Sequence, residues 1–389
     1  MLSAMRICVV YDCLFPCTVG GAERWYRNLS ERLAGEGHEV TYLTLRQWPR
    51  GEPPEVPGVR VIAAGPRMAL YTEGGRRRIL PPLVFGLGVL LHLMRHGRRY
   101  QVVHTCSFPY FSLLAAALLR RLRGYGLVVD WHEVWSAAYW RGYLGRFGGP
   151  VGHLVQRLCA RVPQRAFCFS RLHAARLRGE GLRGEPILLE GEYAGSLVRP
   201  VAQEAEPLVV FAGRLIPEKR APLAVAAFAA AARRIEGLRG ELYGDGPERE
   251  AVAAAIARHG VGGALVAPGF VAGEQIEQAL GRAMCMLSTS SREGYGMVVI
   301  EAAAAATPSV VVAGEDNAAT ELIEPGVNGF LAPEPDAESI AAQIVAVHEA
   351  GLSLRERTAE WFGTHAERLS LESSLRKVLA SYEPDIARA

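Results

Sequence analysis

The stretch Ser290–Pro308 reads SSREGYGMVVIEAAAAATP. Its two glutamates, Glu293 and Glu301, stand eight positions apart and are separated by a Gly-Tyr-Gly turn and an apolar run. The turn glycines break regular structure and allow close approach of the backbone. The alanine-rich run from Met297 predicts a helix that Pro308 ends. We therefore expect Glu293 on the loop before a helix and Glu301 about one turn into it.

This arrangement suits a particular kind of ligand. The N-terminus of a helix presents backbone N–H groups and the positive end of the helix dipole, which together hold phosphate. One carboxylate ahead of the helix and one inside it could accept hydrogen bonds from hydroxyls on either side of that phosphate. Sugar hydroxyls on one side and ribose hydroxyls on the other describe a nucleotide sugar. The alternative is a helix that carries two surface glutamates without a ligand.

A second motif precedes this stretch. The apolar run LVVFAG is strand-like, and it leads into the segment Gly213–Lys219, in which the cations Arg214 and Lys219 stand five positions apart. A Gly-Asp-Gly-Pro turn follows at Gly244–Pro247. Two cations close to a phosphate-binding helix could neutralise a diphosphate.

In this order and spacing, the cation pair, the Gly244–Pro247 turn and the Glu-x7-Glu stretch resemble the retaining nucleotide-sugar glycosyltransferases of the GT-B fold, specifically the large family four. The resemblance covers residues 206–350 densely and residues 5–200 loosely. It implies an α/β protein of two Rossmann-like, doubly wound parallel-sheet domains that face each other across a cleft. It also implies transfer of a hexose-type sugar from a nucleoside-diphosphate sugar to a hydroxyl acceptor, with retention of configuration and without a cofactor.

Length and composition agree with a two-domain enzyme. The chain has 389 residues, of which 50% are hydrophobic and 21% charged, and this is enough for two cores. The N-terminus lacks the apolar stretch of a signal peptide and is better interpreted as a first strand. The seven cysteines show no metal-ligand spacing, so we expect mostly buried thiols in a reducing cytoplasm.

Charge divides the chain near residue 200. Residues 1–200 hold 27 Arg and no Lys against 14 Asp and Glu, a net charge of +13. Residues 201–389 hold 16 Lys and Arg against 26 Asp and Glu, a net charge of −10. Such a contrast supports a domain boundary between two electrostatically different halves.

Short apolar runs alternate with longer amphipathic segments in both halves, which predicts parallel sheets covered by helices on both faces. We expect an acceptor-binding domain at 1–195, a donor-binding domain at 206–367 and a terminal helix at 368–389 that crosses back to the first domain. The predicted strands are Arg6–Tyr11, Glu39–Leu45, Val59–Ala64, Val102–Thr105, Leu127–Trp131, Ala166–Phe169, Pro186–Leu189, Leu208–Ala212, Glu241–Tyr243, Ala264–Ala267, Met284–Ser288, Ser309–Val312 and Gly329–Leu331.

Two features of the first half could belong to a site. Gly20 and Gly21 lie on a loop that leads into a helix, where the resemblance implies a loop near the donor phosphate and the acceptor; a plain turn is the alternative. His132 follows a predicted strand, where the resemblance implies contact with the transferred sugar. Aromatic residues gather around it, either as an acceptor platform or as ordinary packing: Trp131, Trp135, Tyr139, Trp140 and Tyr143.

Glycosyl transfer requires that negative charge on the departing diphosphate be stabilised. The residues assigned to catalysis are Arg214, Lys219, Glu293 and His132. Glu301 is expected to hold ribose hydroxyls and Glu293 sugar hydroxyls, as the resemblance implies. The donor-binding residues are Gly20, Gly21, Phe270, Val271, Gly294, Tyr295, Gly296, Met297, Val298 and Glu301. The nucleotide base is placed near Phe270 and Val271. With two cations, a helix dipole and no Asp-x-Asp motif, no metal is predicted.

The sequence departs from the family pattern at Leu189–Glu192, where a Pro-Asn-Gly-type turn is common, and at Glu315–Leu322, which lacks a Gly-Gly opening. The first departure puts the acceptor side in doubt. An epimerase or a non-catalytic nucleotide-sugar-binding subunit of the same fold stays an alternative. A phosphorylase would need a pyridoxal lysine, and the chain has only Lys219 and Lys377. A UDP-sugar is favoured over a GDP-sugar, and no nucleic-acid partner is expected.

One basic-flanked apolar run bears on the acceptor. Arg76–Arg78 and Arg95–Arg99 bracket Ile79–Met94, which is too short and too interrupted by proline and glycine to span a bilayer. Such a helix can lie in an anionic membrane surface; the alternative is a core helix. The first interpretation predicts a lipid-linked or anionic acceptor and a cytoplasmic protein that touches the inner face of the membrane. The second predicts a soluble acceptor.

Overall fold

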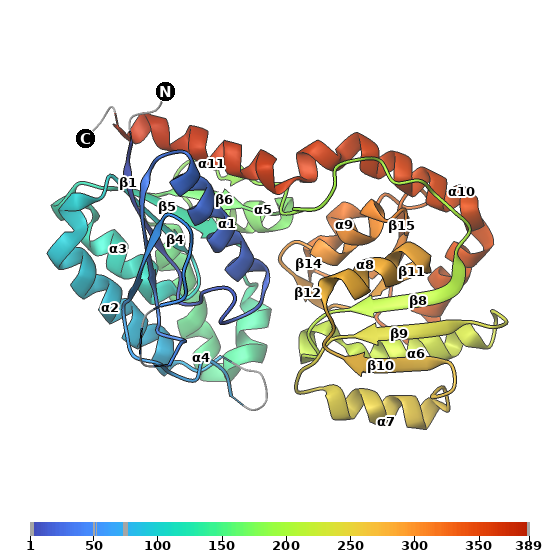
Figure 1. The fold of residues 1–389 in the computed structure, drawn as a ribbon. Coiled ribbons are helices and arrows are strands. Elements are labelled where there is room, and N and C mark those ends of the chain that lie inside the picture. Colours follow the sequence, from blue (N-terminus) through green and yellow to red (C-terminus); the bar gives the residue numbers. More distant parts are fainter. Residues whose placement is uncertain (1–3, 50, 52, 73–76, 387–389) are drawn as a thin grey trace. The chain divides into compact units, whose positions relative to one another are not determined.

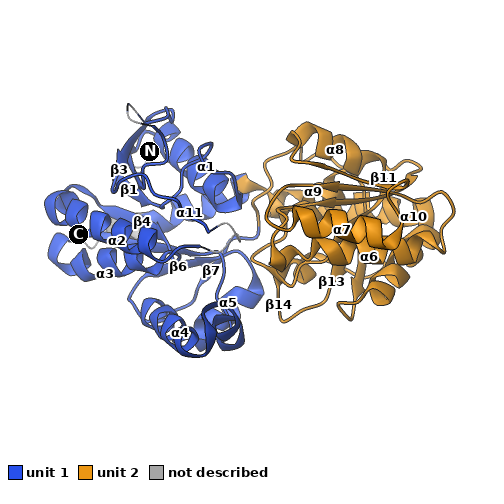
Figure 2. Ribbon diagram, turned by 90° about the horizontal axis from the view of Figure 1, so that it is seen from below, with its two compact units in different colours: residues 1–72, 76–190, 372–389 blue, residues 73–75, 191–371 orange. Residues whose placement is uncertain are grey.

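The computed structural model describes residues 4–49, 51, 53–72 and 77–386, and it confirms the predicted α/β class (Figure 1). The chain divides into two compact units (Figure 2). Unit 1 comprises residues 1–72, 76–190 and 372–389, and unit 2 comprises residues 73–75 and 191–371. Each unit is built on its own parallel sheet.

The sheet of unit 1 has seven parallel strands in the order β3-β2-β1-β4-β5-β6-β7. Its central strands are mostly apolar and almost entirely buried, as a sheet covered on both faces requires. The strands are β1 (Arg6–Val10), β2 (Glu39–Thr44), β3 (Val59–Ala63), β4 (Val102–Cys106), β5 (Gly126–Trp131), β6 (Arg165–Cys168) and β7 (Ile187–Leu188).

The helices of unit 1 follow the direction of the crossovers. The β3→β4, β4→β5 and β5→β6 connections run the same way across the sheet, so right-handed crossovers place their helices on one face. The β1→β2 connection runs the opposite way and places its helix on the other face (Figure 1). The helices are α1 (Gly21–Gly35), α2 (Leu80–His96), η1 (Gly97–Arg99), α3 (Tyr110–Arg123), α4 (Ala137–Ala160), α5 (Arg171–Gly179) and α11 (Leu371–Ile386).

Unit 2 contains a six-stranded parallel sheet in the order β10-β9-β8-β11-β13-β15 and a two-stranded ladder of β12 with β14. The strands are β8 (Glu206–Ala212), β9 (Arg239–Tyr243), β10 (Leu265–Gly269), β11 (Ala283–Ser288), β12 (Arg292–Glu293), β13 (Ser309–Val312), β14 (Asp316–Asn317) and β15 (Gly329–Ala332). The helices are η2 (Pro217–Lys219), α6 (Ala221–Ala232), α7 (Arg249–His259), α8 (Gly273–Arg282), α9 (Met297–Ala304), η3 (Ala318–Leu322) and α10 (Ala337–Leu369).

The thirteen strands predicted from the sequence are all present, with ends that differ by no more than two residues. The β12–β14 ladder was not predicted, because each strand is two residues long and carries no periodic pattern. The predicted thiols are also confirmed. All seven cysteines are free, and only Cys17 is exposed.

The helix predicted from Met297 ends earlier than expected. It stops at Ala304, and Pro308 does not end it. Ala306 takes a left-handed conformation, with φ of 56°, and the amide of Thr307 donates to the carbonyl of Ala302 at 2.8 Å. The hydroxyl of Thr307 donates to the carbonyl of Leu280 at 2.6 Å. Tertiary contacts of Thr307 thus accompany the early end of a run whose alanines favour continuation.

A buried polar chain joins α11 to the sheet of unit 1. His104 Nε2 lies 2.8 Å from Asp130 Oδ1, and His104 Nδ1 lies 2.6 Å from the hydroxyl of Tyr382. Trp25 Nε1 donates to Asp130 Oδ2 at 2.7 Å. Burial acts to raise the pKa of Asp130, but His104 and the other donors lower it overall. Asp130 is therefore an ionised carboxylate in the core, held by its neighbours.

Removing the Tyr382 hydroxyl should destabilise the protein, because this buried chain would lose a hydrogen bond. We expect Tyr382→Phe to lower the free energy of unfolding by about 1–3 kcal/mol, because a buried histidine nitrogen loses its partner. Chemical denaturation measures the loss. Tyr100→Phe is the control, since the Tyr100 hydroxyl contacts the half-buried His92 at 2.8 Å and should matter less. Equal losses in the two variants would contradict the proposed cost of burial.

Within the described residues, no helix combines the length and the apolar character needed to cross a membrane.

Candidate active site

Three loops of unit 2 lie together where β8, β9 and β10 end. The amide of Gly213 donates to the carbonyl of Tyr243 at 3.0 Å, and the amide of Leu215 donates to the carbonyl of Asp245 at 2.9 Å. The amide of Gly244 donates to the carbonyl of Gly269 at 2.8 Å. The carboxyl edge of a parallel sheet is where α/β proteins bind ligands. The Gly213–Lys219 motif is therefore anchored at the expected edge.

Glycine is required in the middle loop. Gly244 has φ of 132°, and a Cβ there would lie 1.8 Å from the carbonyl oxygen of Gly213. This close approach places the loop of Arg214 directly against the turn after β9. The Arg214 side chain is exposed, and within the described part of the chain no carboxylate forms an ion pair with it. It is available to a ligand.

Lys219 and Glu293, which are 74 positions apart, form an ion pair through Lys219 Nζ and Glu293 Oε1. The hydroxyl of Ser290 donates to the same carboxylate oxygen at 2.7 Å. The side chains of Lys219 and Glu293 are only 22% and 16% exposed, so the pair is shielded from solvent on most sides. The structure thus brings together the two motifs that the sequence singled out separately.

Backbone contacts hold the two loops in place. The hydroxyl of Thr289 donates to the carbonyl of Lys219 at 2.8 Å, and the amide of Ser291 donates to the carbonyl of Glu218 at 2.8 Å. Arg220, which directly follows Lys219, has φ of 50°, a conformation that is unfavourable for a residue with a Cβ. Strained backbone of this kind persists where surrounding contacts over-determine it.

Asn317 supports Glu293 from a third segment, and the sequence reasoning missed this role. Glu293 pairs with Asn317 in the β12–β14 ladder. The buried Asn317 side chain donates to the carbonyl of Val312 at 2.8 Å and to that of Ser290 at 3.2 Å. The only signal in the sequence is a polar residue within the segment Glu315–Leu322, which departed from the family pattern.

The turn after Glu293 leads into α9. Gly296 has φ of 112° and precedes the first helical residue, Met297. The first amides of a helix have no partner within it, so those of Met297 and Val298 are the donors expected at this helix start. Glu301 is the fifth residue of α9 and is half-buried. The prediction that Glu293 precedes a helix and that Glu301 lies about one turn into it is confirmed, but Glu293 belongs to the short strand β12 and not to a loop, because it pairs with β14.

Gly296 should tolerate no side chain. A Cβ there would lie 2.6 Å from the Cβ of Ala319, and its φ is left-handed. We expect Gly296→Ala to lower the free energy of unfolding by about 2 kcal/mol or more. Gly273→Ala is the control, because a Cβ at Gly273 meets nothing within 4 Å. Thermal unfolding compares the two variants. An unchanged midpoint for Gly296→Ala would contradict the described turn.

Phe270 and Val271 directly follow β10, next to the loop of Gly244. The Phe270 side chain is 74% exposed and Val271 is half-buried. An aromatic ring so exposed is available for stacking on a base. The structure places both residues at the same sheet edge as the Gly213–Lys219 motif.

In unit 1, Gly20 and Gly21 lie at the N-terminus of α1. Gly20 has extended backbone, with φ of −172°, and a Cβ there would lie 2.4 Å from Oε2 of Glu23. Nothing lies within 4 Å of a Cβ at Gly21. Gly21 is exposed, whereas the buried Glu23 places a carboxylate at the amide end of this fifteen-residue helix.

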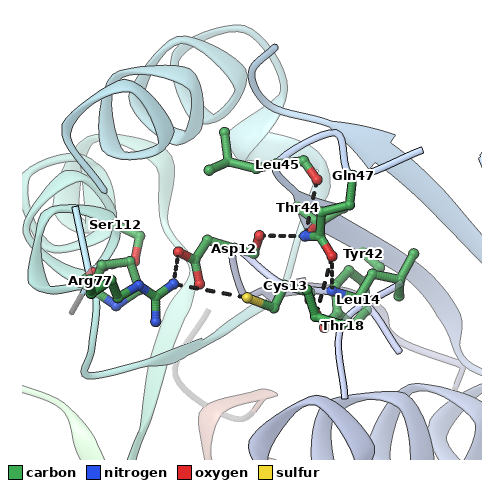
Figure 3. A network of polar contacts seen from close by, with 11 residues as sticks. Asp12, Cys13, Leu14, Thr18, Tyr42, Thr44, Leu45, Gln47, Arg77 and Ser112 are labelled. Atoms are coloured by element: carbon green, nitrogen blue, oxygen red, sulfur yellow. Dashed lines mark hydrogen bonds and ion pairs between the residues drawn. The ribbon is translucent and has the colours of Figure 1, made fainter. Parts of the chain in front are cut away.

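The loop between β1 and Gly20 is anchored by a polar network around Asp12 and Gln47 (Figure 3). Gln47 Nε2 donates to the carbonyl of Asp12 at 2.7 Å, and Gln47 Oε1 accepts from the amide of Leu14 at 3.0 Å. The buried carboxylate of Asp12 pairs with Arg77. Burial acts to lower the pKa of Arg77, but Asp12 raises it overall, so Arg77 stays charged.

His132 follows β5, as the sequence predicted, and stacks on Phe169 with ring centroids 4.3 Å apart. Its ring also meets the edge of Tyr26 on α1 at 6.0 Å. Burial lowers the pKa of His132 from 6.5 to about 4, although Asp130 opposes this effect. The imidazole is therefore neutral near pH 7.

The lowered pKa of His132 predicts a pH dependence of stability. Between pH 6.5 and about 4, the unfolded chain protonates this histidine and the folded chain does not, so stability falls as pH falls through that window. We expect His132→Gln to make the fall shallower. Exposed His259→Gln is the control and should keep the wild-type slope. Urea unfolding at several pH values tests this, and an unchanged slope for His132→Gln would contradict it.

The aromatic cluster near His132 consists partly of core residues. Trp131 and Trp140 are buried, and the buried Gln156 Oε1 accepts from Trp140 Nε1 at 3.1 Å and from the amide of Trp135 at 3.0 Å. Packing therefore explains Trp131 and Trp140. The half-buried members are Trp135, Tyr139 and Tyr143.

Comparison with known proteins agrees with these two units. A profile described as "Glycosyl transferase 4-like domain" matches residues 20–189, and one described as "Glycosyl transferases group 1" matches residues 198–360. Two parallel-sheet units with these matches define a glycosyltransferase of the GT-B fold. Residues 198–360 belong to the glycosyl transferases group 1 family.

Curated relatives carry transferase and synthase names. D-inositol 3-phosphate glycosyltransferase of Segniliparus rotundus is 28% identical, and the match covers 93% of this chain and 84% of the relative. Alpha-D-kanosaminyltransferase of Streptomyces kanamyceticus is 25% identical over 86% of this chain and 92% of its own. Glycogen synthase of Mycobacterium tuberculosis is 26% identical over 88% of this chain and 86% of its own.

Solved structures share the fold. A sucrose-phosphate synthase from Thermosynechococcus elongatus superposes with a TM-score of 0.78 at 19% identity, covering 99% of this chain and all of the other. The Anabaena protein HepE, solved in complex with UDP and glucose, gives a TM-score of 0.70 at 17% identity, covering 98% of this chain and 100% of its own.

Proposed function

We propose that the protein transfers a hexose-type sugar from a nucleoside-diphosphate sugar, with UDP favoured and GDP the alternative, to a hydroxyl acceptor, with retention of configuration. Unit 2 binds the donor and unit 1 binds the acceptor. The observation that carries this proposal is the Lys219–Glu293 pair at the start of α9. It joins a cation, a carboxylate and the amide end of a helix at the carboxyl edge of a parallel sheet.

The chemistry assigned to these groups follows from charge. As the bond to the sugar breaks, negative charge grows on the diphosphate and positive charge on the sugar ring. Arg214 binds diphosphate oxygens through bidentate hydrogen bonds, Lys219 adds a point charge, and the α9 amides add neutral donors. Glu293 accepts from sugar hydroxyls and Glu301 from ribose hydroxyls. His132 supplies a neutral hydrogen-bonding group to the transferred sugar.

Two cations and a helix dipole supply the charge that other transferases take from a divalent metal, so the proposal includes no metal step. Retention, with the acceptor attacking on the face that the diphosphate leaves, rests on the family resemblance. Phe270 stacks on the base or lies beside it. The family resemblance assigns Gly20 and Gly21 to the donor phosphate on the acceptor side.

The relatives support transfer over the alternatives. Their names describe transferases and synthases, and none of these names describes an epimerase or a binding subunit. HepE was solved with UDP and with UDP-glucose, which favours uridine in the donor proposed here.

Hydrolysis of donor without acceptor tests the assignment. UDP- and GDP-linked hexoses are incubated with the protein, and release of the nucleoside diphosphate is measured beside binding by calorimetry. We expect slow hydrolysis of one donor that also binds most tightly. Binding without release, in the presence of a broad set of acceptors, would favour the non-catalytic subunit. Conversion to a different sugar nucleotide would favour the epimerase.

A further inference from the structure

Three helices cover one face of the sheet in unit 1. Crossover direction places α2, α3 and α4 on the same face, and α3 packs against both of the others. Figures 1 and 2 both draw α2 and α3 side by side. At Gly86 of α2, an added Cβ would lie 2.6 Å from the Cβ of Phe111 on α3. The two helices are therefore in close contact, with their outer sides turned away from the sheet.

The outer sides of these helices are apolar. Leu87 on α2, Leu118 on α3 and Phe147 on α4 are 57%, 72% and 86% exposed. On α2 and α4 the exposed apolar residues recur every three or four positions, so that each forms a single stripe. We call the whole set the apolar face: Leu80, Leu83, Leu87, Leu91, Met94, Leu118, Leu122, Phe147, Val151, Leu154 and Leu158.

This concentration is unusual for the molecule. The described residues expose nineteen large apolar side chains, and eleven of them belong to the apolar face. Scattered exposed leucines are normal, but a group of exposed apolar residues on neighbouring helices indicates a partner. The inner side of α2 has its own core residues, among them Phe85, Val89 and Leu93. The sequence therefore supplies apolar residues to α2 beyond those needed for packing.

The charge around the apolar face has one sign. α2, α3 and α4 together contain no Asp or Glu. Exposed arginines lie beside the stripes, and within the described residues none of these is ion-paired: Arg95, Arg98, Arg121 and Arg146. Arg157 of α4 differs, since it pairs with Glu180 at 3.5 Å. Of the basic residues predicted before α2, Arg76 lies outside the described residues, and Arg77 turns inward to Asp12 and is unavailable at the surface.

We propose that the apolar face docks on an anionic lipid bilayer and lies in its surface. Leucine, valine and phenylalanine enter the boundary between headgroups and acyl chains, and the flanking arginines contact lipid phosphates. A second copy of the chain fits poorly, because two such faces would bring arginines together without a carboxylate between them. This docking places unit 1 at a lipid surface and goes beyond the proposed sugar transfer, on which it does not depend.

Sedimentation of the full-length protein with vesicles tests the proposal. Neutral phosphatidylcholine vesicles are compared with vesicles that also contain phosphatidylglycerol, from about 50 mM to about 500 mM salt. We expect at least tenfold stronger binding to the anionic vesicles at low salt, and weaker binding as salt rises. If anionic vesicles sediment no more protein than neutral vesicles at low salt, the proposal is overturned.

Paired variants separate the apolar face from general charge. Arg95→Gln with Arg98→Gln should weaken binding by about tenfold. The control removes the same charge from exposed positions of unit 2, Arg234→Gln with Arg258→Gln, and should leave binding nearly unchanged. Equal losses in the two pairs would show attraction through net charge alone and would overturn the docking face.

A second pair of double variants tests the contribution of the apolar residues. Leu87→Gln with Leu91→Gln should also weaken binding by at least tenfold, whereas Val198→Gln with Val201→Gln, exposed in unit 2, should not. Analytical ultracentrifugation without lipid tests the alternative that the apolar face binds a second copy of the chain. A wild-type dimer that Leu87→Gln with Leu91→Gln dissociates would assign the face to a second copy and overturn the proposal.

Discussion

Replacing Lys219 with alanine should lower turnover by roughly 10²–10³-fold, because the departing diphosphate loses a charge-assisted donor worth about 3 kcal/mol in the transition state. The loss in stability should be smaller. Lys219 forms a half-buried ion pair with Glu293, and Glu293 keeps the hydroxyl of Ser290 at 2.7 Å when the lysine is gone. Steady-state kinetics and thermal unfolding of the same preparation separate the two effects.

Lys377→Ala is the matched control, since Lys377 is the second lysine of the chain. Its ammonium donates to the carbonyl of Leu188 at 3.1 Å in unit 1, so its loss should leave turnover nearly unchanged. Lys219→Met keeps much of the aliphatic stem without the charge, and it should be as inactive as Lys219→Ala. Turnover close to wild type in a folded Lys219→Ala protein would sink the assignment of this residue.

The second large effect separates the two glutamates by the ligand that each one holds. Glu301→Ala should weaken both the free nucleoside diphosphate and the nucleotide sugar by roughly 10–100-fold, because hydrogen bonds from ribose to a charged acceptor are lost. Glu293→Ala should leave affinity for the free diphosphate nearly unchanged while turnover falls. Calorimetry with UDP and with UDP-glucose measures both variants.

The Lys219–Glu293 pair adds a control to this experiment. Glu293→Ala releases Lys219 from its partner, which could strengthen diphosphate binding, so Glu293→Gln is measured beside it. Glu250→Ala, exposed on α7, removes one carboxylate of unit 2 outside the site and reports the general effect of net charge. Equal losses of affinity for free UDP in the Glu293 and Glu301 variants would mean that the assigned roles are wrong.

The features that could be predicted from the sequence are those set by a local pattern of residues. A strand of a doubly wound sheet is an apolar run between breakers, so each of the thirteen predicted strands could be found without knowing its neighbours. The same holds for Glu293 and Glu301, whose places relative to a helix follow from two glycines and an alanine run. The end of α9 shows the limit, because the helix stops at Ala304 where Thr307 contacts a distant segment, although the alanine run continues.

The sequence predicted individual residues of the candidate site but not the contacts between them. Lys219 and Glu293 each belonged to a recognisable motif, yet their pairing depends on β8 and β11 being neighbours in the sheet. Asn317 carried only a weak signal, a polar residue in a departing segment, because its contacts are to backbone carbonyls that any sequence could supply. For the same reason, Arg77 could not be told from its exposed neighbours before its pairing with Asp12 was seen.

By itself, the sequence determined the class of fold, the positions of the strands and the residues that form the two motifs. Each of these is set within a few residues by periodicity, glycine, proline and charge. The tertiary structure alone decided which distant groups meet, as with Lys219 and Glu293, and which side of each helix faces water. The exposed apolar residues of α2, α3 and α4 lie on one side of the sheet because strand order and right-handed crossovers place the three helices there. No local pattern encodes that arrangement.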